Sequence, residues 1–437
     1  MLVLIFLAVP VAIAISVPSV LGIYVVSGTA SAVSVLSSAP FNTVASWTYS
    51  VIPAFIFMGM LMVESGLTTK IYRATERWFG WLPGGAGVGT TAAGAGLASV
   101  SGSTIGMTYA LARAAIPELL RAGFNKKMAV GTVIVAGIPG SVIPPSILLV
   151  VYAGIATVPV GQQLVAGVIP GVLIAVAFGA LILSIGFFKP ALVGKSAGDK
   201  KFTSEYSWGD RFSSLLPIWG FPAVMLVLFG GLFSGAFTPT EAGAAAALMA
   251  LVVAVVTNIQ SGAIQRVGRA ALKTVSASAA IFFIIIGAEL LTRLLSITGL
   301  SRLVTSWIVG FDLNPITFLL ALMVMYLLMG MFFDTLSMMV LTVPILVPIL
   351  TQMDISLIWF GIFMVLLGEL AMVTPPVGIL SFIIHGIAKD PEVNLGHNIT
   401  LGDIFTSLAW FLPVAVAFIV FLIFVPELVE WLPALVG

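Results

Sequence analysis

Two polar breaks interrupt an otherwise apolar chain, and both carry residues that can bind an ion or an anion. The first is Ser101-Gly102-Ser103-Thr104, and the second runs from Gly330 through Phe332-Phe333 to Asp334-Thr335. Each lies between two helical segments of about half the membrane-spanning length. Backbone that leaves the helix at membrane depth is tolerated only where it is buried in protein or lines a polar cavity. We therefore interpret both breaks as the tips of helical hairpins that bind something.

The second half-helix of each hairpin begins at a residue that favours helix starts. These residues are Ser103 and Asp334, and both are good N-caps. Capping alone would explain them, but helix N-termini also carry partial positive charge that attracts anions. If the two tips face each other at mid-membrane, they form a site for an anionic substrate. The predicted substrate-binding residues are Ser103, Thr104, Ser146, Asp334 and Thr335.

Two proline-containing segments predict unwound stretches inside transmembrane spans. Gly137 to Ser146 interrupts the span 128–158, and Gly368 to Gly378 interrupts the span 356–388. Proline lacks an N–H and frees the carbonyl four residues earlier. Freed carbonyls beside Ser or Thr hydroxyls are ligands of the kind that Na⁺ takes at discontinuous helices. We predict one Na⁺ site per broken span, with a kinked packing helix as the alternative for either break.

Acidic residues inside apolar segments are functional candidates, because burying a charge in a membrane is costly. Asp334 is the strongest candidate because it lies at a tip. Glu64 and Glu289 fall near span ends, and Glu369 falls beside the second break or pairs with a neighbour. Glu241 follows Thr-Pro-Thr and fits the first turn of a capped helix.

The amino-acid composition indicates that membrane-spanning helices position these residues. Of 437 residues, 60% are hydrophobic and only 8% are charged, with a mean hydropathy of +1.19, whereas soluble proteins carry about 25% charged residues. Apolar runs near 20 residues recur, so we predict an all-α polytopic membrane protein rather than a β-barrel. No cysteine is present, and His385 and His397 have no third metal ligand nearby. We expect no enzyme activity and no nucleic-acid partner; the net charge of +1 says nothing about partners.

An internal repeat connects the breaks. Pro144-Pro145 matches Pro375-Pro376 at an offset of 231 residues, which also relates Gly137 to Gly368 and Thr104 to Thr335. Inverted repeats of this kind are common in secondary transporters. We expect a first unit at 1–188 with a hairpin at about 85–121, and a second at 240–437 with a hairpin at about 315–350. Residues 189–239 form a cytoplasmic loop and one connecting helix at 212–234.

Loop charges predict the orientation in the lipid bilayer. Lys and Arg cluster in 65–82, 111–127, 189–211 and 266–273, and such clusters face the cytoplasm. We expect a retained first span at about 1–26, an uncharged connection at 27–40, a cytoplasmic N-terminus and a periplasmic C-terminus. The first hairpin then opens inward and the second outward, which agrees with an inverted repeat.

Several motifs together resemble the large membrane subunit of the tripartite ATP-independent periplasmic (TRAP) transporters. They are Gly94-x-Gly96 with Ser101-Gly102-Ser103, Ala115-Ile116-Pro117-Glu118, Gly137-x-Pro139 with Pro144-Pro145-Ser146, Thr238-Pro239-Thr240-Glu241-Ala242, and Thr374-Pro375-Pro376-Val377-Gly378. The resemblance covers nearly the whole chain.

The resemblance implies Na⁺-coupled import of a carboxylate, such as a C4-dicarboxylate or sialic acid, across the bacterial inner membrane by an elevator mechanism. It implies two partners, a small four-helix membrane subunit on a separate polypeptide and a periplasmic substrate-binding protein. Motif matching assigns two Na⁺ sites. The first takes Ser101, Gly102, Ser103, Gly137 and Pro139, and the second takes Gly330, Asp334, Gly368 and Thr374.

Two other functions stay open. A stand-alone Na⁺/dicarboxylate symporter of the related divalent-anion family would transport without a binding protein. An ion channel would need a continuous pore with repeated filter carbonyls, whereas the two tips have different sequences.

Overall fold

The computed structural model describes residues 1–7, 9–102, 104–194, 206–259 and 262–436. Within these ranges the chain is helical and contains no strand, apart from an isolated bridge between Phe124 and Val193. Seven of the described helical segments are long and apolar enough to cross a membrane, or nine if each bent helix pair counts as one span. The predicted all-α membrane class, with broken helices, is confirmed.

The first half of the chain contains most of the shorter helices. Their bounds are α1 Leu2–Phe6, α2 Val11–Val44, η1 Trp47–Ser50, α3 Val51–Glu64, α4 Leu67–Phe79, α5 Gly85–Ser101, α6 Thr104–Arg121, α7 Lys126–Val135, α8 Ile138–Val142, α9 Ile147–Ala156, α10 Val160–Ala166 and α11 Val168–Phe188. The second half follows with η2 Pro190–Leu192, α12 Trp208–Leu215, η3 Leu216–Ile218, α13 Gly220–Phe233, α14 Pro239–Asn258, α15 Ala263–Thr298, α16 Leu300–Val309, α17 Pro315–Met329, α18 Thr335–Gln352, α19 Leu357–Ala371, α20 Ile379–Ile387, α21 Pro391–Asn394, α22 Leu401–Phe424 and α23 Glu427–Val436.

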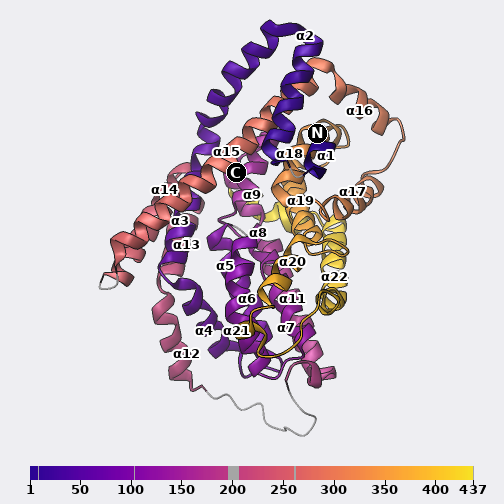
Figure 1. The fold of residues 1–437 in the computed structure, drawn as a ribbon. Coiled ribbons are helices and arrows are strands. Elements are labelled where there is room, and N and C mark those ends of the chain that lie inside the picture. Colours follow the sequence, from indigo (N-terminus) through magenta and orange to yellow (C-terminus); the bar gives the residue numbers. More distant parts are fainter. Residues whose placement is uncertain (8, 103, 195–205, 260–261, 437) are drawn as a thin grey trace.

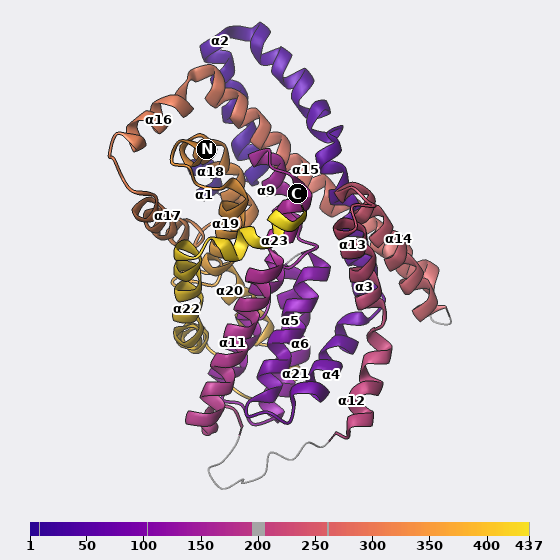
Figure 2. The ribbon, with the colours of Figure 1, turned by 180° about the vertical axis from the view of Figure 1, so that it is seen from behind.

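The helices form two packed groups (Figures 1 and 2). The flank group consists of α2, α3, α13, α14 and α15, in which α15 packs on α2 and α3, and α14 packs on α3 and α13. The core group consists of α5 to α11 and α17 to α23. Here α5 packs on α8 and α11, and α19 packs on α8, α9 and α10. Helix α4 joins α3 of the flank group to α5 of the core group.

Burial in the core group follows the internal repeat. Residues 128–142 form one unbroken buried run, and residues 359–373 form another. Both ends of the second run lie 231 residues after those of the first (359 − 128 and 373 − 142). The two broken spans therefore occupy equivalent, fully enclosed places in the core group.

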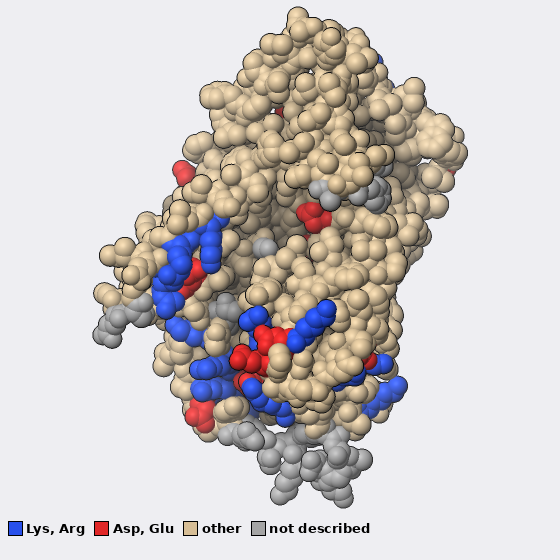
Figure 3. All heavy atoms as spheres, viewed as in Figure 1, with Lys and Arg blue, Asp and Glu red and all other residues tan. Residues whose placement is uncertain are grey.

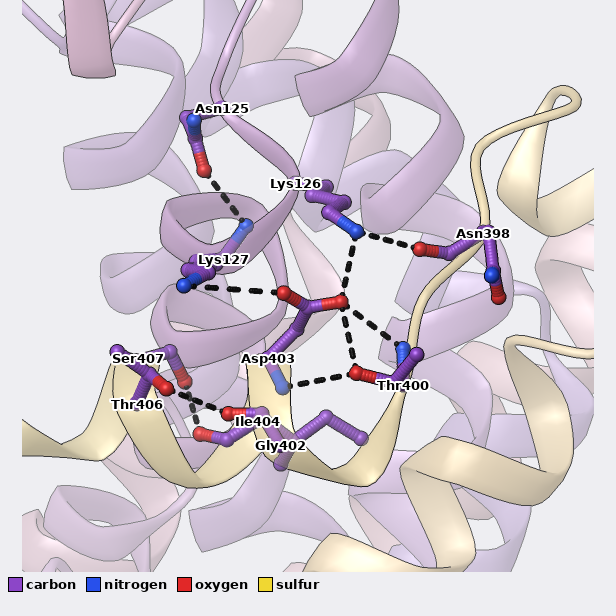
Figure 4. A network of polar contacts seen from close by, with 10 residues as sticks. All are labelled: Asn125, Lys126, Lys127, Asn398, Thr400, Gly402, Asp403, Ile404, Thr406 and Ser407. Carbon is purple, nitrogen blue, oxygen red and sulfur yellow. Dashed lines mark hydrogen bonds and ion pairs between the residues drawn. The ribbon is translucent and has the colours of Figure 1, made fainter.

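Polar side chains fix the helix starts at the end of the molecule where the basic residues gather. In Figure 3, Lys and Arg lie in the lower half and on the left flank of this face. Figure 4 shows Asp403, near the start of α22, between two lysines at the start of α7. The Asp403 carboxylate lies 2.7 Å from Lys126 Nζ and 3.8 Å from Lys127 Nζ. It also accepts bonds from Thr400 in a capping box, so one carboxylate ties together helices far apart in the sequence.

The N-terminal segment differs from the prediction. Residues 27–40 are not a connection but part of α2, which bends at Gly28, where φ is +79°. Figure 1 shows the two parts of α2 meeting at the top of the molecule, and both views place both termini in the upper half, away from the basic end. Met1 packs near Ala288 and Leu291 of α15. The predicted end of the first span at residue 26 is therefore wrong, because the helix continues beyond it and bends at Gly28.

The connecting helix also differs from a single span at 212–234. It is a pair, Trp208–Ile218 and Gly220–Phe233, bent by 61°. Pro217 explains the break, because proline has no N–H to donate within a helix.

Candidate functional site

Each predicted hairpin region contains two helices separated by a short break. In the first, α5 ends at Ser101, Gly102 caps it with φ +62°, and α6 begins at Thr104. Ser103 lies outside the described residues, so the structure does not place its predicted cap and ligand roles. In the second, α17 ends at Met329 and α18 begins at Thr335. Its cap is Asp334, which accepts a bond from Ser337 N at 3.4 Å and another from the Ser337 hydroxyl.

The structure brings the two tips together around one cavity of about 110 Å³. Its lining comes from both hairpins and both broken spans: Gly102, Thr104, Ile105, Leu148, Asp334, Thr335, Leu336, Glu369 and Met372. Three of the predicted substrate-binding residues, Thr104, Asp334 and Thr335, are among them. The helix starts of α6 and α18 therefore lie at the same small polar space, and helix starts favour negative charge.

In each repeat, the tip threonine lies on the glycine of the broken span. A Cβ placed on Gly137 would lie 3.0 Å from the Thr104 methyl group, and one on Gly368 would lie 2.5 Å from the Thr335 methyl group. At Gly368 the contact is too close for a side chain unless Thr335 moves, whereas 3.0 Å at Gly137 is a tight contact that a small shift of Thr104 relieves. The two contacts are related by the same offset, since 335 − 104 and 368 − 137 both give 231.

A second pair of contacts between hairpin and broken span is related by the same offset. In the first repeat the glycine lies in the broken span, and in the second repeat it lies in the hairpin. A Cβ on Gly140 of the first break would lie 2.8 Å from the Ser99 amide nitrogen. In the second repeat the glycine is Gly330 on the hairpin, where a Cβ would lie 2.2 Å from the Ala371 Cβ. Gly330 therefore lets the second hairpin pack closely against α19, and it does not line the cavity between the tips.

The first broken span unwinds between α8 and α9, and its two parts, Lys126–Val142 and Ile147–Ala156, are bent relative to each other by 46°. Ser146 caps α9 by accepting from Leu149 N at 3.3 Å, and its own hydroxyl donates to the Ser141 carbonyl. Ser146, Gly102 and Thr104 line a small space of about 10 Å³ beside the main cavity. Pro139 lies inside α8, where its carbonyl accepts from Ile143 N at 3.2 Å, and it lines neither space.

The second broken span unwinds after Ala371, and the Pro375-Pro376 bond is cis, as is the Pro144-Pro145 bond. The Thr374 hydroxyl donates to the Leu370 carbonyl at 2.8 Å. Thr374 does not line the cavity between the tips, whereas Met372 of the same segment does.

Ser101 faces a different environment from the other tip residues. It lines an apolar cavity of about 170 Å³ between α3 and the first hairpin, beside Met60 and Met107. On the opposite side of this contact, a Cβ on Gly59 would lie 2.3 Å from the Val100 carbonyl. The first tip therefore packs against α3 of the flank group, and Ser101 lies at that contact.

Glu369 is the acid that the sequence ranked below Asp334. Its side chain is 1% exposed, and its Oε1 accepts from the Thr335 hydroxyl at 3.0 Å. A charged residue inside an apolar span is a functional candidate, and Glu369 meets that criterion. Its place between the tips depends on its contact with Thr335, which lies 34 residues earlier in the sequence. Sequence spacing alone does not reveal such a contact. The structure brings Glu369 into the site.

The polar side chains that line this cavity belong to two threonines and two acids, and four of its other lining side chains are apolar. Hydroxyls, carboxylates and backbone carbonyls suit hard cations such as Na⁺. Among the described residues, no group of three or more His, Cys, Asp or Glu side chains forms a metal cluster. The cavity combines these oxygens with two helix starts.

Comparison with known proteins gives consistent similarities. Residues 1–428 match the family described as "Tripartite ATP-independent periplasmic transporter, DctM component". The chain is similar to the C4-dicarboxylate TRAP transporter large permease DctM of Vibrio cholerae, with 28% identity over 98% of this chain and 94% of the relative. It is 30% identical to DctM of Pseudomonas aeruginosa, over 91% and 88%. The sialic acid TRAP large permease SiaM of Vibrio cholerae is 26% identical, over 88% and 87%.

The fold is also found in a solved transporter structure. The Alcanivorax borkumensis YdaH transporter, described as having an unusual topology, superposes with a TM-score of 0.69 over 93% of this chain and 90% of its own, at 15% identity.

Proposed function

This chain belongs to the DctM component family of the tripartite ATP-independent periplasmic transporters, and we propose that it imports an organic carboxylate across the bacterial inner membrane, driven by Na⁺ entry. The chain is a TRAP large permease, and its relatives are named for C4-dicarboxylates and sialic acid. The substrate proposed here is a carboxylate of this kind.

The observation that carries the proposal is the cavity shared by the two hairpin tips. Two helix starts stabilise a carboxylate, and the surrounding oxygens hold Na⁺ close to it. The cation then reduces the repulsion between the carboxylate and Asp334. Cation and anion binding thereby favour each other, which is the energetic requirement for coupled transport.

The movement proposed is an elevator, in which the core group shifts against the flank group. The dense packing within each group supports it, and the groups meet where α15 packs on α18 and α3 packs on α5. Helix α4 connects them between two glycines of positive φ, Gly66 and Gly84. The equivalent contacts at the 231-residue offset support inverted units at 1–188 and 240–437, with 189–239 between them.

The basic end is proposed to face the cytoplasm. The C-terminus, which lies in the half of the molecule away from the basic end (Figure 1), is then proposed to face the periplasm. A tripartite assembly has two further components, and we propose that they are a small four-helix membrane subunit and a periplasmic substrate-binding protein.

Reconstitution in proteoliposomes tests this function. Uptake of labelled succinate and sialic acid is measured with and without a Na⁺ gradient, using this chain together with the proposed small membrane subunit and periplasmic binding protein. Saturable uptake that needs Na⁺ and the binding protein is the expected result. Uptake by this chain alone would favour the stand-alone symporter, and non-saturable flux without coupling would favour a channel.

A further inference from the structure

Glu369 has a property that the proposed site does not yet use. Its Oε2 is buried and has no hydrogen-bond partner among the described residues, although its Oε1 is bonded to the Thr335 hydroxyl. The Thr104 hydroxyl of the first hairpin is a second hydrogen-bonding neighbour of this carboxyl. A buried carboxylate with an unpaired oxygen is costly unless a positive charge or a further donor reaches it.

We propose that Glu369 provides the carboxylate of a Na⁺ site in the cavity between the two tips, separate from the two sites predicted within the repeats. The inference rests on the proposed function, because it names a further residue that holds the coupling ion. The site joins the repeats, since its walls come from the first hairpin, the second hairpin and α19.

The charge of the cavity favours a cation. Among its lining residues, Asp334 and Glu369 are acidic, and none is Lys, Arg or His. Two acidic side chains on one small cavity attract a cation and disfavour a free anion. A substrate carboxylate can therefore enter this cavity only beside a bound cation. The acidic lining thus requires the cation to bind before the carboxylate.

The size and ligands of the cavity favour a small, hard ion. A volume of about 110 Å³ corresponds to a few water molecules, since one water takes about 30 Å³ of liquid. Carboxylate and hydroxyl oxygens are hard donors. Gly368 holds α19 close enough to α18 for Thr335 to reach Glu369. Thr335 thereby fixes the carboxyl and leaves Oε2 for the ion.

The test uses the purified full chain in detergent and Na⁺ as the probe. Thermal unfolding is followed while Na⁺ replaces choline at constant ionic strength, with K⁺ and Li⁺ as parallel series. In Glu369→Gln the Na⁺ concentration for half-maximal stabilisation is expected to rise roughly tenfold or more, which corresponds to about 1.4 kcal/mol. Without Na⁺ the variant is expected to be more stable than the wild type, because the unpaired charge is gone.

Controls make the result specific. Glu289→Gln alters an acid on α15 that is paired with Arg293 at 2.8 Å and does not line the cavity, so its Na⁺ response is expected to equal that of the wild type. Should Glu369→Gln fail to fold, Thr335→Val keeps the carboxylate but removes its donor, and a weaker Na⁺ response is expected.

An unchanged Na⁺ midpoint in Glu369→Gln overturns the site, as does an unchanged midpoint in Thr335→Val where the first variant does not fold. An equal loss in Glu289→Gln also overturns it. Carboxylate uptake by the wild type that needs no Na⁺ would instead contradict the proposed function. The two failures are therefore distinguishable.

Discussion

Gly368 shows how a single missing side chain shapes the second half of the site. A methyl group there would come within 2.5 Å of Thr335, the residue that bonds to Glu369. Gly368→Ala is expected to lower the free energy of unfolding by about 1–3 kcal/mol, the usual cost of overpacking, and to reduce Na⁺-dependent uptake. Thermal denaturation and proteoliposome uptake measure the two effects.

The matched control is Gly386→Ala in α20. Gly386 is exposed, and a Cβ there meets nothing within 4 Å. Alanine is the better helix former by about 1 kcal/mol, so this variant is expected to keep or slightly raise stability with normal uptake. Equal behaviour of the two variants would contradict the packing role of Gly368.

Thr374 tests the predicted second ion site. Its hydroxyl donates to the Leu370 carbonyl, and Thr374→Val keeps the shape of the side chain while removing that oxygen. If Thr374 is a ligand, the variant is expected to lose Na⁺ from the transport stoichiometry or to need more Na⁺ for half-maximal uptake. Thr351→Val is the control, because the Thr351 hydroxyl makes the same kind of bond, to Val347 at 2.9 Å, outside the site. An unaltered stoichiometry and Na⁺ midpoint would remove Thr374 from the site.

At the residue scale, residue type and position in an apolar segment select the threonines, Asp334 and the glycines as candidates. Their partners could not be predicted, because each contact joins helices that are distant in sequence. Gly368 was predicted as a carbonyl ligand, and the structure shows in addition that it makes room for Thr335. The rank of Glu369 was too low for the same reason, since hydropathy carries no information about which hairpin faces α19.

Helix starts at the basic end hold the two repeats together, and Asp403 is the element-scale example (Figure 4). Its side chain is 11% exposed and paired with Lys126. Asp403→Asn is expected to destabilise the chain by about 1–3 kcal/mol, between the values for exposed and buried ion pairs. The loss should shrink at high salt because screening weakens the pair in the wild type.

Glu427→Gln is the control for this prediction, since Glu427 is exposed at the start of α23. Chemical or thermal denaturation at low and high salt gives both measurements. A stability of Asp403→Asn equal to that of the wild type at low salt would show that the α7–α22 junction does not depend on this carboxylate.

Element boundaries were predictable where a physical signal marked them. Half-length helices and Pro-Pro pairs marked the hairpin regions and the broken spans. The bend of α2 was not foreseen, because Gly28 is one glycine in a run of small and apolar residues that also fits a loop. Pro217 could have signalled the α12–α13 break, but the apolar pattern continued across it.

At the scale of the molecule, the boundary between the flank group and the core group is the surface that an elevator must move along. A cavity of about 440 Å³ lies on it, lined by Trp47, Pro159, Gly161 and Pro239 among others. Here α10 of the core group meets α14 of the flank group, and a Cβ on Gly161 would lie 3.3 Å from Pro239 Cγ. Motion between the groups changes this distance.

Because the chain contains no cysteine, a disulfide across this boundary can be made without a competing thiol. The double variant is Gly161→Cys with Pro239→Cys, because a Cβ on Gly161 already lies 3.3 Å from the Pro239 side chain and disulfides join Cβ atoms about 3.5–4.5 Å apart. Oxidation is expected to abolish Na⁺-dependent uptake, and reduction is expected to restore it. The control pair, Gly243→Cys with Val51→Cys, lies inside the flank group, where a Cβ on Gly243 would lie 2.7 Å from Val51 Cγ2. Oxidising that pair should leave uptake intact, since it joins helices that do not move apart. Full uptake by the oxidised Gly161–Pro239 variant would mean that the two groups transport without sliding past each other.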